Sequence, residues 1–144
     1  MNILVSRCLL GKPCRYDGKS KPVPVLKRLV EAGHKLIPVC PEVLGGLPTP
    51  RPPAEIQADG RVVNRAGEDV TEEYQLGARL ALELAREHGC TLAVLKANSP
   101  SCGNNQIYDG TFSKTLISGQ GIAAKLLTEA GIRVVNETQL ELYL

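Results

Sequence analysis

Apolar runs and amphipathic segments alternate along the chain, which is the pattern of an α/β fold. Four runs rich in valine, isoleucine and leucine indicate buried strands, at residues 2–8, 34–40, 90–97 and 132–136. Apolar residues spaced three and four apart predict helices, at residues 22–33, 69–89, 117–131 and 137–144. We therefore expect a parallel sheet of about four strands in the order 2-1-3-4, with helices on both faces, as in Rossmann-like or flavodoxin-like folds.

A long insert separates the second predicted strand from the longest helix. Residues 41–53, PEVLGGLPTPRPP, contain five prolines and two glycines, which exclude a helix interior or a central strand. Residues 54–64 carry two β-prone pieces around Asp59 and Gly60, and this pair is a strong hairpin signal. The insert is therefore predicted to be a loop followed by a small hairpin.

The composition limits the classes of protein to consider. With 144 residues, of which 43% are hydrophobic, the chain is expected to form a single domain over residues 1–144, with a largely aliphatic core because only 3% are aromatic. A formal net charge of +2 does not indicate a large nucleic-acid surface. The sequence has no apolar run of about 18 residues and no signal-peptide pattern, so we expect a cytoplasmic protein that does not enter a membrane.

Five cysteines are present, and this odd number argues against a disulfide framework. Cys8 and Cys40 end the first two predicted strands, and Cys102 lies in the loop after the third. Because the carboxyl ends of parallel strands meet at one edge of a sheet, these three thiols are expected to share a site. Cys90 begins a strand at the opposite edge and is interpreted as a core residue, whereas Cys14, in a loop near Cys8, is ambiguous.

The type of site follows from the ligand set. Structural zinc sites use four ligands and usually paired C-x-x-C motifs, which this chain lacks. Both histidines, His34 and His88, fall where surface positions are expected, so neither is a good ligand or a base for a catalytic cysteine. Iron–sulfur clusters are held by thiolates, normally four, so three would leave one iron open to a substrate.

Polar residues near the same edge are candidates for catalysis. Glu42 follows Cys40 by two residues in an apolar, proline-rich loop, where burial favours a general base, although an ordinary loop carboxylate is an equally good interpretation. Ser99 and Ser101 flank Pro100 beside Cys102 and are candidates to hold a water or to donate to a substrate oxygen, with turn formation as the alternative. Four further residues are candidates to line a pocket: Arg15, Tyr16, Asp17 and Arg51. Surface charge is the alternative interpretation for all of them, and for Arg51 it is the favoured one.

Three stretches resemble a known family. SRCLLGKPCRYDG, IPVCPEVLGGLPTPRPPAE and SPSCG followed by IYDGTF are similar, in order and spacing, to motifs of the bacterial thiouracil desulfidase family, long known as a domain of unknown function. The resemblance implies a [4Fe-4S] cluster held by Cys8, Cys40 and Cys102 only. It also implies that Glu42 is catalytic together with a serine of SPSCG, either Ser99 or Ser101, and it favours leaving Cys14 out of the ligand set.

The activity implied by this resemblance is non-redox conversion of 2- or 4-thiouracil to uracil and sulfide. An open iron then acts as a Lewis acid towards the thiocarbonyl sulfur, while Glu42 deprotonates a water that attacks the ring carbon. The expected partner is a small thiolated pyrimidine. The alternatives are an enzyme acting on thiolated nucleosides of transfer RNA, a non-enzymatic carrier of metal or sulfur, and a protein without metal.

Overall fold

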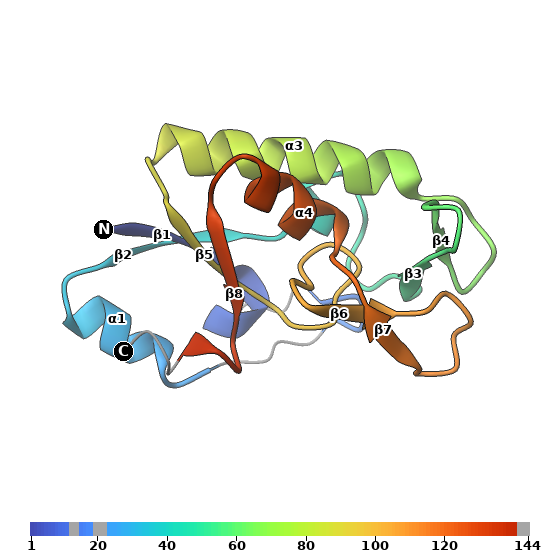
Figure 1. The fold of residues 1–144 in the computed structure, drawn as a ribbon, viewed down its shortest axis with the longest axis horizontal. Helices are drawn as coiled ribbons and strands as arrows, with labels where there is room; N and C mark the ends of the chain where they lie inside the picture. Colours follow the sequence, from blue (N-terminus) through green and yellow to red (C-terminus); the bar gives the residue numbers. More distant parts are fainter. Residues whose placement is uncertain (12–14, 19–22, 141–144) are drawn as a thin grey trace.

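A parallel sheet of four strands lies at the centre of the fold, in the order β2-β1-β5-β8 (Figure 1). The computed structural model describes residues 1–11, 15–18 and 23–140. The strands of this sheet are β1 (Asn2–Ser6), β2 (Lys35–Val39), β5 (Leu92–Leu95) and β8 (Arg133–Asn136). In the central strand β1, Leu4 pairs with Ile37 on one side and with Ala93 on the other. The predicted strand order and the parallel direction of the strands are confirmed.

Helices cover both faces of the sheet, as predicted. The helices α3 (Thr71–Glu87) and α4 (Ile122–Glu129) lie on one face, and α1 (Leu26–Glu31) lies on the other with the 3-10 turn η1 (Arg7–Leu10) (Figure 1). Successive residues of β1 point to opposite faces, because Leu4 belongs to the core under α3 and α4 whereas Ile3 and Val5 belong to the core under α1. A strand buried on both faces is continuously apolar, which explains the run that predicted it.

The short helix α2 (Pro41–Leu44) packs against α3 through two glycines. A Cβ atom on Gly77 of α3 would overlap the carbonyl oxygen of Pro41, and a Cβ atom on Gly45 would overlap the carbonyl oxygen of Glu73. Only glycine permits such a close approach of two backbones. The two glycines therefore set the distance between α2 and α3, and with it the place of every side chain on α2.

We expect Gly77→Ala to destabilise the protein, although glycine-to-alanine changes inside helices ordinarily stabilise by up to about 1 kcal/mol. The added methyl group has no space beside Pro41, so the free energy of unfolding should fall by about 1–3 kcal/mol. Urea unfolding followed by circular dichroism measures this change. The control is Arg79→Ala at an exposed position of α3, and a Gly77→Ala variant as stable as the parent would contradict the close contact.

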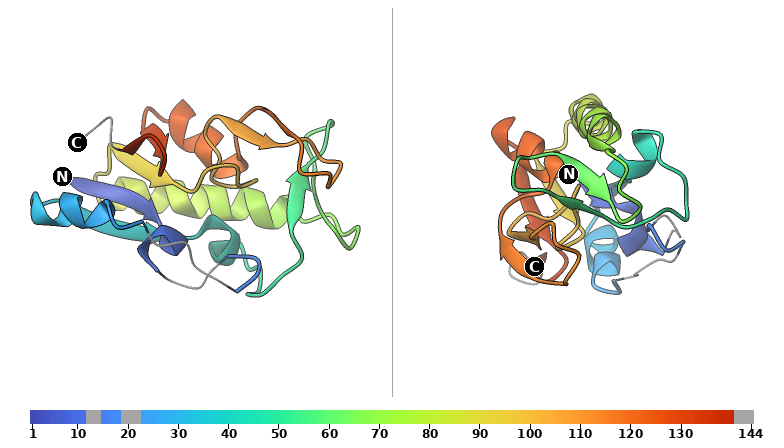
Figure 2. Two further views of the ribbon diagram at one scale, coloured as in Figure 1. Left: turned by 90° about the horizontal axis from the view of Figure 1, so that it is seen from below. Right: turned by 90° about the vertical axis from the view of Figure 1, so that its right-hand side faces the viewer.

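Two small hairpins lie beyond the same end of the sheet (Figure 2). The first consists of β3 (Ala54–Ile56) and β4 (Val62–Asn64), with Asp59 and Gly60 at its turn, and it confirms the predicted hairpin. The second consists of β6 (Gln106–Tyr108) and β7 (Leu116–Ser118), and the sequence pattern did not predict it. The site described below lies between these hairpins and the ends of the parallel strands.

Three predicted segments differ from the structure. Residues 41–44 form a helical turn, α2, because a proline in the first turn of a helix lacks only a hydrogen bond that would be absent anyway. The helix predicted over residues 117–131 begins at Ile122, and the residues before it belong to β7 and a connecting turn. Of the predicted closing helix, residues 137–139 form turns, and residues 141–144 are outside the described part of the chain.

Candidate active site

A cavity of about 400 Å³ opens at the carboxyl ends of β1, β2 and β5. Ser6 and Val39 end two of these strands, Lys96 follows the third, and all three residues line the cavity. The hairpins contribute Glu55 from β3 and Tyr108 from β6. This is the edge at which open parallel sheets bind ligands, and it is the edge at which the sequence predicts the site.

Three cysteines from three separate segments line this cavity. Cys8 lies in η1, Cys40 lies between β2 and α2, and Cys102 lies in the loop after β5. The predicted convergence of the three thiols is confirmed, although Cys8 lies in a 3-10 turn rather than at the end of a strand. Cys90 lies outside the cavity in the core under α3 and α4, where burial raises the pKa of its thiol. Cys14 falls outside the described residues.

The thiol of Cys102 is enclosed by polar neighbours in an otherwise buried place. The hydroxyl groups of Ser6 and Ser101 each lie 3.5 Å from its sulfur atom, within hydrogen-bond distance of it. Burial raises the pKa of Cys102 to about 12, while these two hydrogen bonds act in the opposite direction. Ser6 is itself held by the backbone N–H of Lys96, which donates to its Oγ at 3.0 Å, so the hydroxyl joins β1 to the start of the loop.

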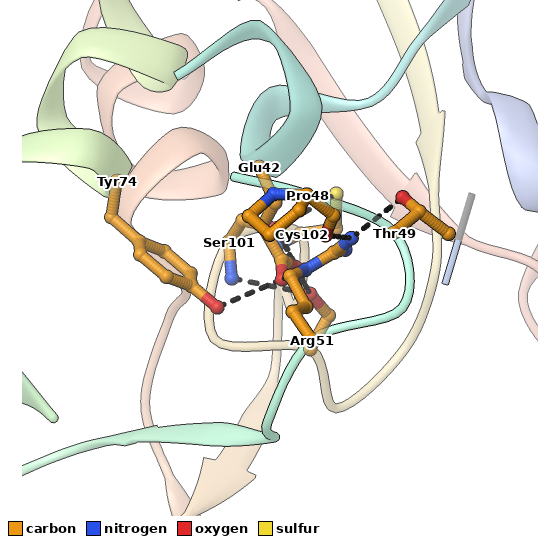
Figure 3. Close-up of polar contacts among 8 residues, drawn as sticks. Glu42, Pro48, Thr49, Arg51, Tyr74, Ser101 and Cys102 are labelled. Atoms are coloured by element: carbon orange, nitrogen blue, oxygen red, sulfur yellow. Dashed lines mark hydrogen bonds and ion pairs between the residues drawn. The ribbon is translucent and has the colours of Figure 1, made fainter. Parts of the chain in front are cut away.

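The carboxylate of Glu42 is the centre of a hydrogen-bond network that joins four segments (Figure 3). Its Oε1 atom accepts hydrogen bonds from Arg51 Nε at 3.0 Å and from the hydroxyl of Tyr74 at 2.8 Å. Its Oε2 atom accepts from Ser101 Oγ at 2.9 Å and lies 3.5 Å from Ser99 Oγ. The two oxygens therefore have different partners, since Oε1 is held by residues of the insert and of α3 and Oε2 faces the cysteine loop.

Arg51 is an ion-pair partner of Glu42 and not the surface charge that its sequence context favoured. Its side chain is 5% exposed and that of Glu42 is 13% exposed. Its guanidinium also donates to the Pro48 carbonyl at 3.0 Å and to Thr49 Oγ1 at 3.1 Å, so several contacts hold it in one orientation. A nearly buried cation compensates the charge of Glu42, whose carboxylate lies among polar donors and not in the apolar surroundings expected from the loop.

Tyr74 is a site residue that the sequence analysis did not find. It lies on the buried side of α3, and its hydroxyl reaches Glu42 across a sequence separation of 32 residues. Burial, followed by the charge of Glu42, raises the pKa of this hydroxyl far above its usual range. The hydroxyl of Tyr74 therefore stays protonated and donates a hydrogen bond to Glu42. Nothing in the sequence around Tyr74 links this helical residue to Glu42, so the sequence analysis could not find it.

Ser99 and Ser101 have different environments, although both contact Glu42. Ser99 Oγ accepts hydrogen bonds from the backbone N–H groups of Ser101 and Cys102, each at 3.1 Å, which is turn chemistry. The two hydroxyl oxygens are 3.0 Å apart. Because the single hydroxyl proton of Ser101 is donated to Glu42, the hydrogen bond between the two serines is donated by Ser99. The hydroxyls thus form a chain from Ser99 through Ser101 to the carboxylate.

The N-terminus of α4 holds the cysteine loop in place. The N–H groups of Ala123 and Ala124 donate to the carbonyl oxygen of Ser101 at 2.9 and 3.0 Å, and the N–H of Gly121 donates to Gly103 at 2.6 Å. A Cβ atom on Gly121 would lie 2.5 Å from the carbonyl carbon of Ser101. The glycine at the start of this helix thus allows the loop backbone to lie directly against the helix end.

The remaining candidate residues divide into two groups. Arg15 and Tyr16 line the cavity as expected, and Asp17 forms an ion pair with Arg15 at 3.4 Å. His34 and His88 are remote from the cavity, which agrees with the interpretation that neither is a ligand or a base. The lining thus combines three thiols, the two hydrogen-bonded carboxylates of Glu42 and Glu55, and three serine hydroxyls, and it contains no histidine among the described residues.

Comparisons with known proteins agree on one family. The family described as 2-thiouracil desulfurase matches residues 3–139. The chain is 45% identical over 147 aligned positions to the uncharacterized protein YbbK of Bacillus subtilis (strain 168), covering 96% of this chain and 97% of that one. A solved structure of the [4Fe-4S]-dependent thiouracil desulfidase TudS superposes with a TM-score of 0.91 at 48% identity, covering 97% of this chain and 93% of that one. The protein thus belongs to the 2-thiouracil desulfurase family.

Proposed function

We propose that this protein is a desulfidase that replaces the sulfur of a thiouracil with oxygen, using water and releasing sulfide. One observation carries the proposal: three thiols and a hydrogen-bonded carboxylate line the same cavity at the carboxyl edge of the sheet. Membership of the 2-thiouracil desulfurase family and the similarity to TudS, which is named a [4Fe-4S]-dependent thiouracil desulfidase, support the same activity.

The donor set suits an iron–sulfur cluster. Cys8, Cys40 and Cys102 would hold a [4Fe-4S] cluster, and thiolates are its usual ligands. Across the described ranges, no three cysteine, histidine or acidic side chains are grouped closely enough to hold a single metal ion. When bound by three protein thiolates, such a cluster supplies one iron that is open to act as a Lewis acid on the thiocarbonyl sulfur.

The side chains of the protein supply the proton transfers. Glu42 acts as general base through Oε2, because Arg51 and Tyr74 already occupy Oε1. Ser101 shares Oε2 and positions the water that Glu42 deprotonates. The hydroxide adds to the ring carbon, the carbon–sulfur bond breaks, and the products are uracil and hydrosulfide. No electron is gained or lost by the substrate, so the reaction is a hydrolysis.

Ser101, and not Ser99, is expected to be the catalytic serine. Replacing Ser101 by alanine removes a hydrogen bond to a charged group, so turnover should fall by about 10- to 100-fold with the cluster retained. Replacing Ser99 by alanine removes the acceptor of two backbone N–H groups, so it should lower the free energy of unfolding by about 1–2 kcal/mol instead. Sulfide release at equal iron content separates them, and a slower Ser99→Ala variant would reverse the assignment.

The substrate is expected to be a small thiolated pyrimidine. The cavity of about 400 Å³ accommodates a single base with its substituents, and the net charge of +2 does not suggest an extended surface for folded RNA. In the part of the chain that the structure describes, no helix has the length and apolarity to span a membrane.

The decisive experiment is anaerobic reconstitution with iron and sulfide, followed by an assay with 2-thiouracil, 4-thiouracil and 4-thiouridine. We expect a brown protein that releases one sulfide for each uracil formed, without added reductant or oxidant. Metal-free protein prepared with a chelator is the control. A reconstituted protein that carries iron but releases no sulfide from any of the three would favour a carrier of metal or sulfur.

A further inference from the structure

The segment 109–114, between β6 and β7, forms part of the cavity wall through Phe112 and Lys114. It is ordered by many short contacts. Asp109 Oδ1 accepts hydrogen bonds from the backbone N–H and the hydroxyl of Thr111, at 3.0 and 2.6 Å. The hydroxyls of Thr111 and Ser113 are 2.6 Å apart, which continues the chain of contacts along the segment. These bonds stiffen the segment internally but do not attach it to the rest of the protein.

Glu55 of β3 makes that attachment. Glu55 is 8% exposed. Its Oε1 atom accepts hydrogen bonds from the backbone N–H of Gly110 at 3.0 Å and from that of Phe112 at 3.1 Å. Gln57 adds a hydrogen bond from Nε2 to the Gly110 carbonyl at 3.2 Å. A buried carboxylate is costly unless it is hydrogen-bonded, so its place here indicates that the contact with the segment is a specific one.

The backbone of the segment also shows that outside contacts hold it. Phe112 and Lys114 have positive φ angles of 57° and 62°, which residues with a Cβ atom adopt only when their surroundings impose it. Gly110 has φ of +94°, and a Cβ atom there would lie 2.9 Å from the Ile56 carbonyl oxygen. The strand β3 and the segment thus lie in direct contact, and Glu55 holds the backbone of Phe112.

Aromatic side chains are concentrated at this cavity. The sequence has five, four tyrosines and one phenylalanine, and all four that lie within the described residues line the cavity: Tyr16, Tyr74, Tyr108 and Phe112. Tyr74 is the one aromatic residue of the described core, so the rings of Tyr16, Tyr108 and Phe112 are not there to fill it. Phe112 has no hydroxyl group, so it offers the cavity only an apolar ring, which suits contact with a planar heterocycle.

We propose that Phe112 is a specificity-determining residue that packs against the planar ring of the substrate, and that Glu55 is the positioning residue that holds it there. The inference rests on the proposed function, because the ring in question is the pyrimidine. Phe112 contributes to binding and not to the chemical step, since Glu42 takes the proton of the water and Ser101 positions that water.

The test compares Phe112→Ala and Phe112→Leu with Ile117→Ala, an exposed apolar residue of the same hairpin that does not line the cavity. With the cluster loaded, both Phe112 variants should raise the KM for 4-thiouracil by about tenfold and leave kcat within about threefold, whereas Ile117→Ala changes neither. Isothermal titration of the same proteins with uracil should show the same loss of affinity. Unchanged KM and uracil affinity in the Phe112 variants, or equal changes in Ile117→Ala, would overturn the proposal.

Glu55 is tested by two substitutions. Glu55→Gln keeps an oxygen that accepts both N–H groups, so its KM should remain close to that of the parent, while Glu55→Ala should resemble Phe112→Ala. Equal KM values for Glu55→Ala and the parent would remove the positioning role. If the parent itself released no sulfide, the proposed function would fail, whereas the uracil titration would still decide whether Phe112 binds the ring.

Discussion

Alanine at Cys8, at Cys40 or at Cys102 is expected to abolish cluster binding, the largest effect that we predict for any substitution. The three thiols line one cavity but come from three segments, so no neighbouring cysteine among the described residues takes the place of a missing one. A cluster with two protein ligands leaves two irons exposed to solvent and to chelators. Iron content and the absorption spectrum after anaerobic reconstitution measure the loss.

Two other cysteines provide controls for this experiment. Cys90 is buried in the core under α3 and α4, so Cys90→Ala should retain full iron content, with a small loss of stability. Cys14 is outside the described residues, and we expect Cys14→Ser to retain the cluster as well. Full iron loading in an alanine variant of Cys8, Cys40 or Cys102 would refute the three-ligand assignment. If Cys14→Ser lost the cluster while Cys8→Ser kept it, Cys14 would be the ligand in place of Cys8.

Glu42→Gln is expected to bind the cluster and the substrate but to turn over about 10²–10⁴-fold more slowly. Water is a poor nucleophile at neutral pH, and glutamine does not accept its proton. The amide retains an oxygen for Arg51 and Tyr74, so α2 should keep its place beside α3. Single-turnover sulfide release from 4-thiouracil, at equal iron content, measures the effect.

The fold of this variant needs its own check, because it removes the negative charge that pairs with the nearly buried guanidinium of Arg51. Breaking a buried ion pair costs about 3–5 kcal/mol when the remaining charge is unsatisfied, but Arg51 keeps its bonds to Pro48 and Thr49. Urea unfolding gives the actual cost. Tyr74→Phe is the matched comparison, since it removes a donor from Oε1 and leaves Oε2 intact, and should slow turnover by about tenfold or less. Equal rates for Glu42→Gln and the parent would remove Glu42 from the mechanism.

The position of the three cysteines followed from the sequence because it depends on topology alone. Once the apolar runs are strands of a parallel sheet, the ends of β1, β2 and β5 meet at one edge wherever the helices lie exactly. The family resemblance then added the identity of the group that they hold. Neither argument required any distance between elements.

The second hairpin and the partners of Glu42 could not be predicted in the same way. The strands β6 and β7 have three residues each, too few to show a two-residue period, and their connection, residues 109–115, is too long for a two-residue turn although it contains an Asp-Gly pair. Arg51 lies in a proline-rich loop whose course local preferences do not specify. Its ion pair with Glu42 depends on that course, which is why its context favoured surface charge.

The sequence by itself determined the α/β fold, the strand order, the edge that carries the site and the six residues proposed for cluster binding and catalysis: Cys8, Cys40, Glu42, Ser99, Ser101 and Cys102. Only the tertiary structure decided that Arg51 and Tyr74 hold one oxygen of Glu42 while Ser101 meets the other. The physical reason is that side-chain hydrogen bonds form over a range of a few tenths of an ångström. Such distances are set by the packing of whole elements, here by the contact of α2 and α3 at Gly45 and Gly77, and not by the local pattern of residues.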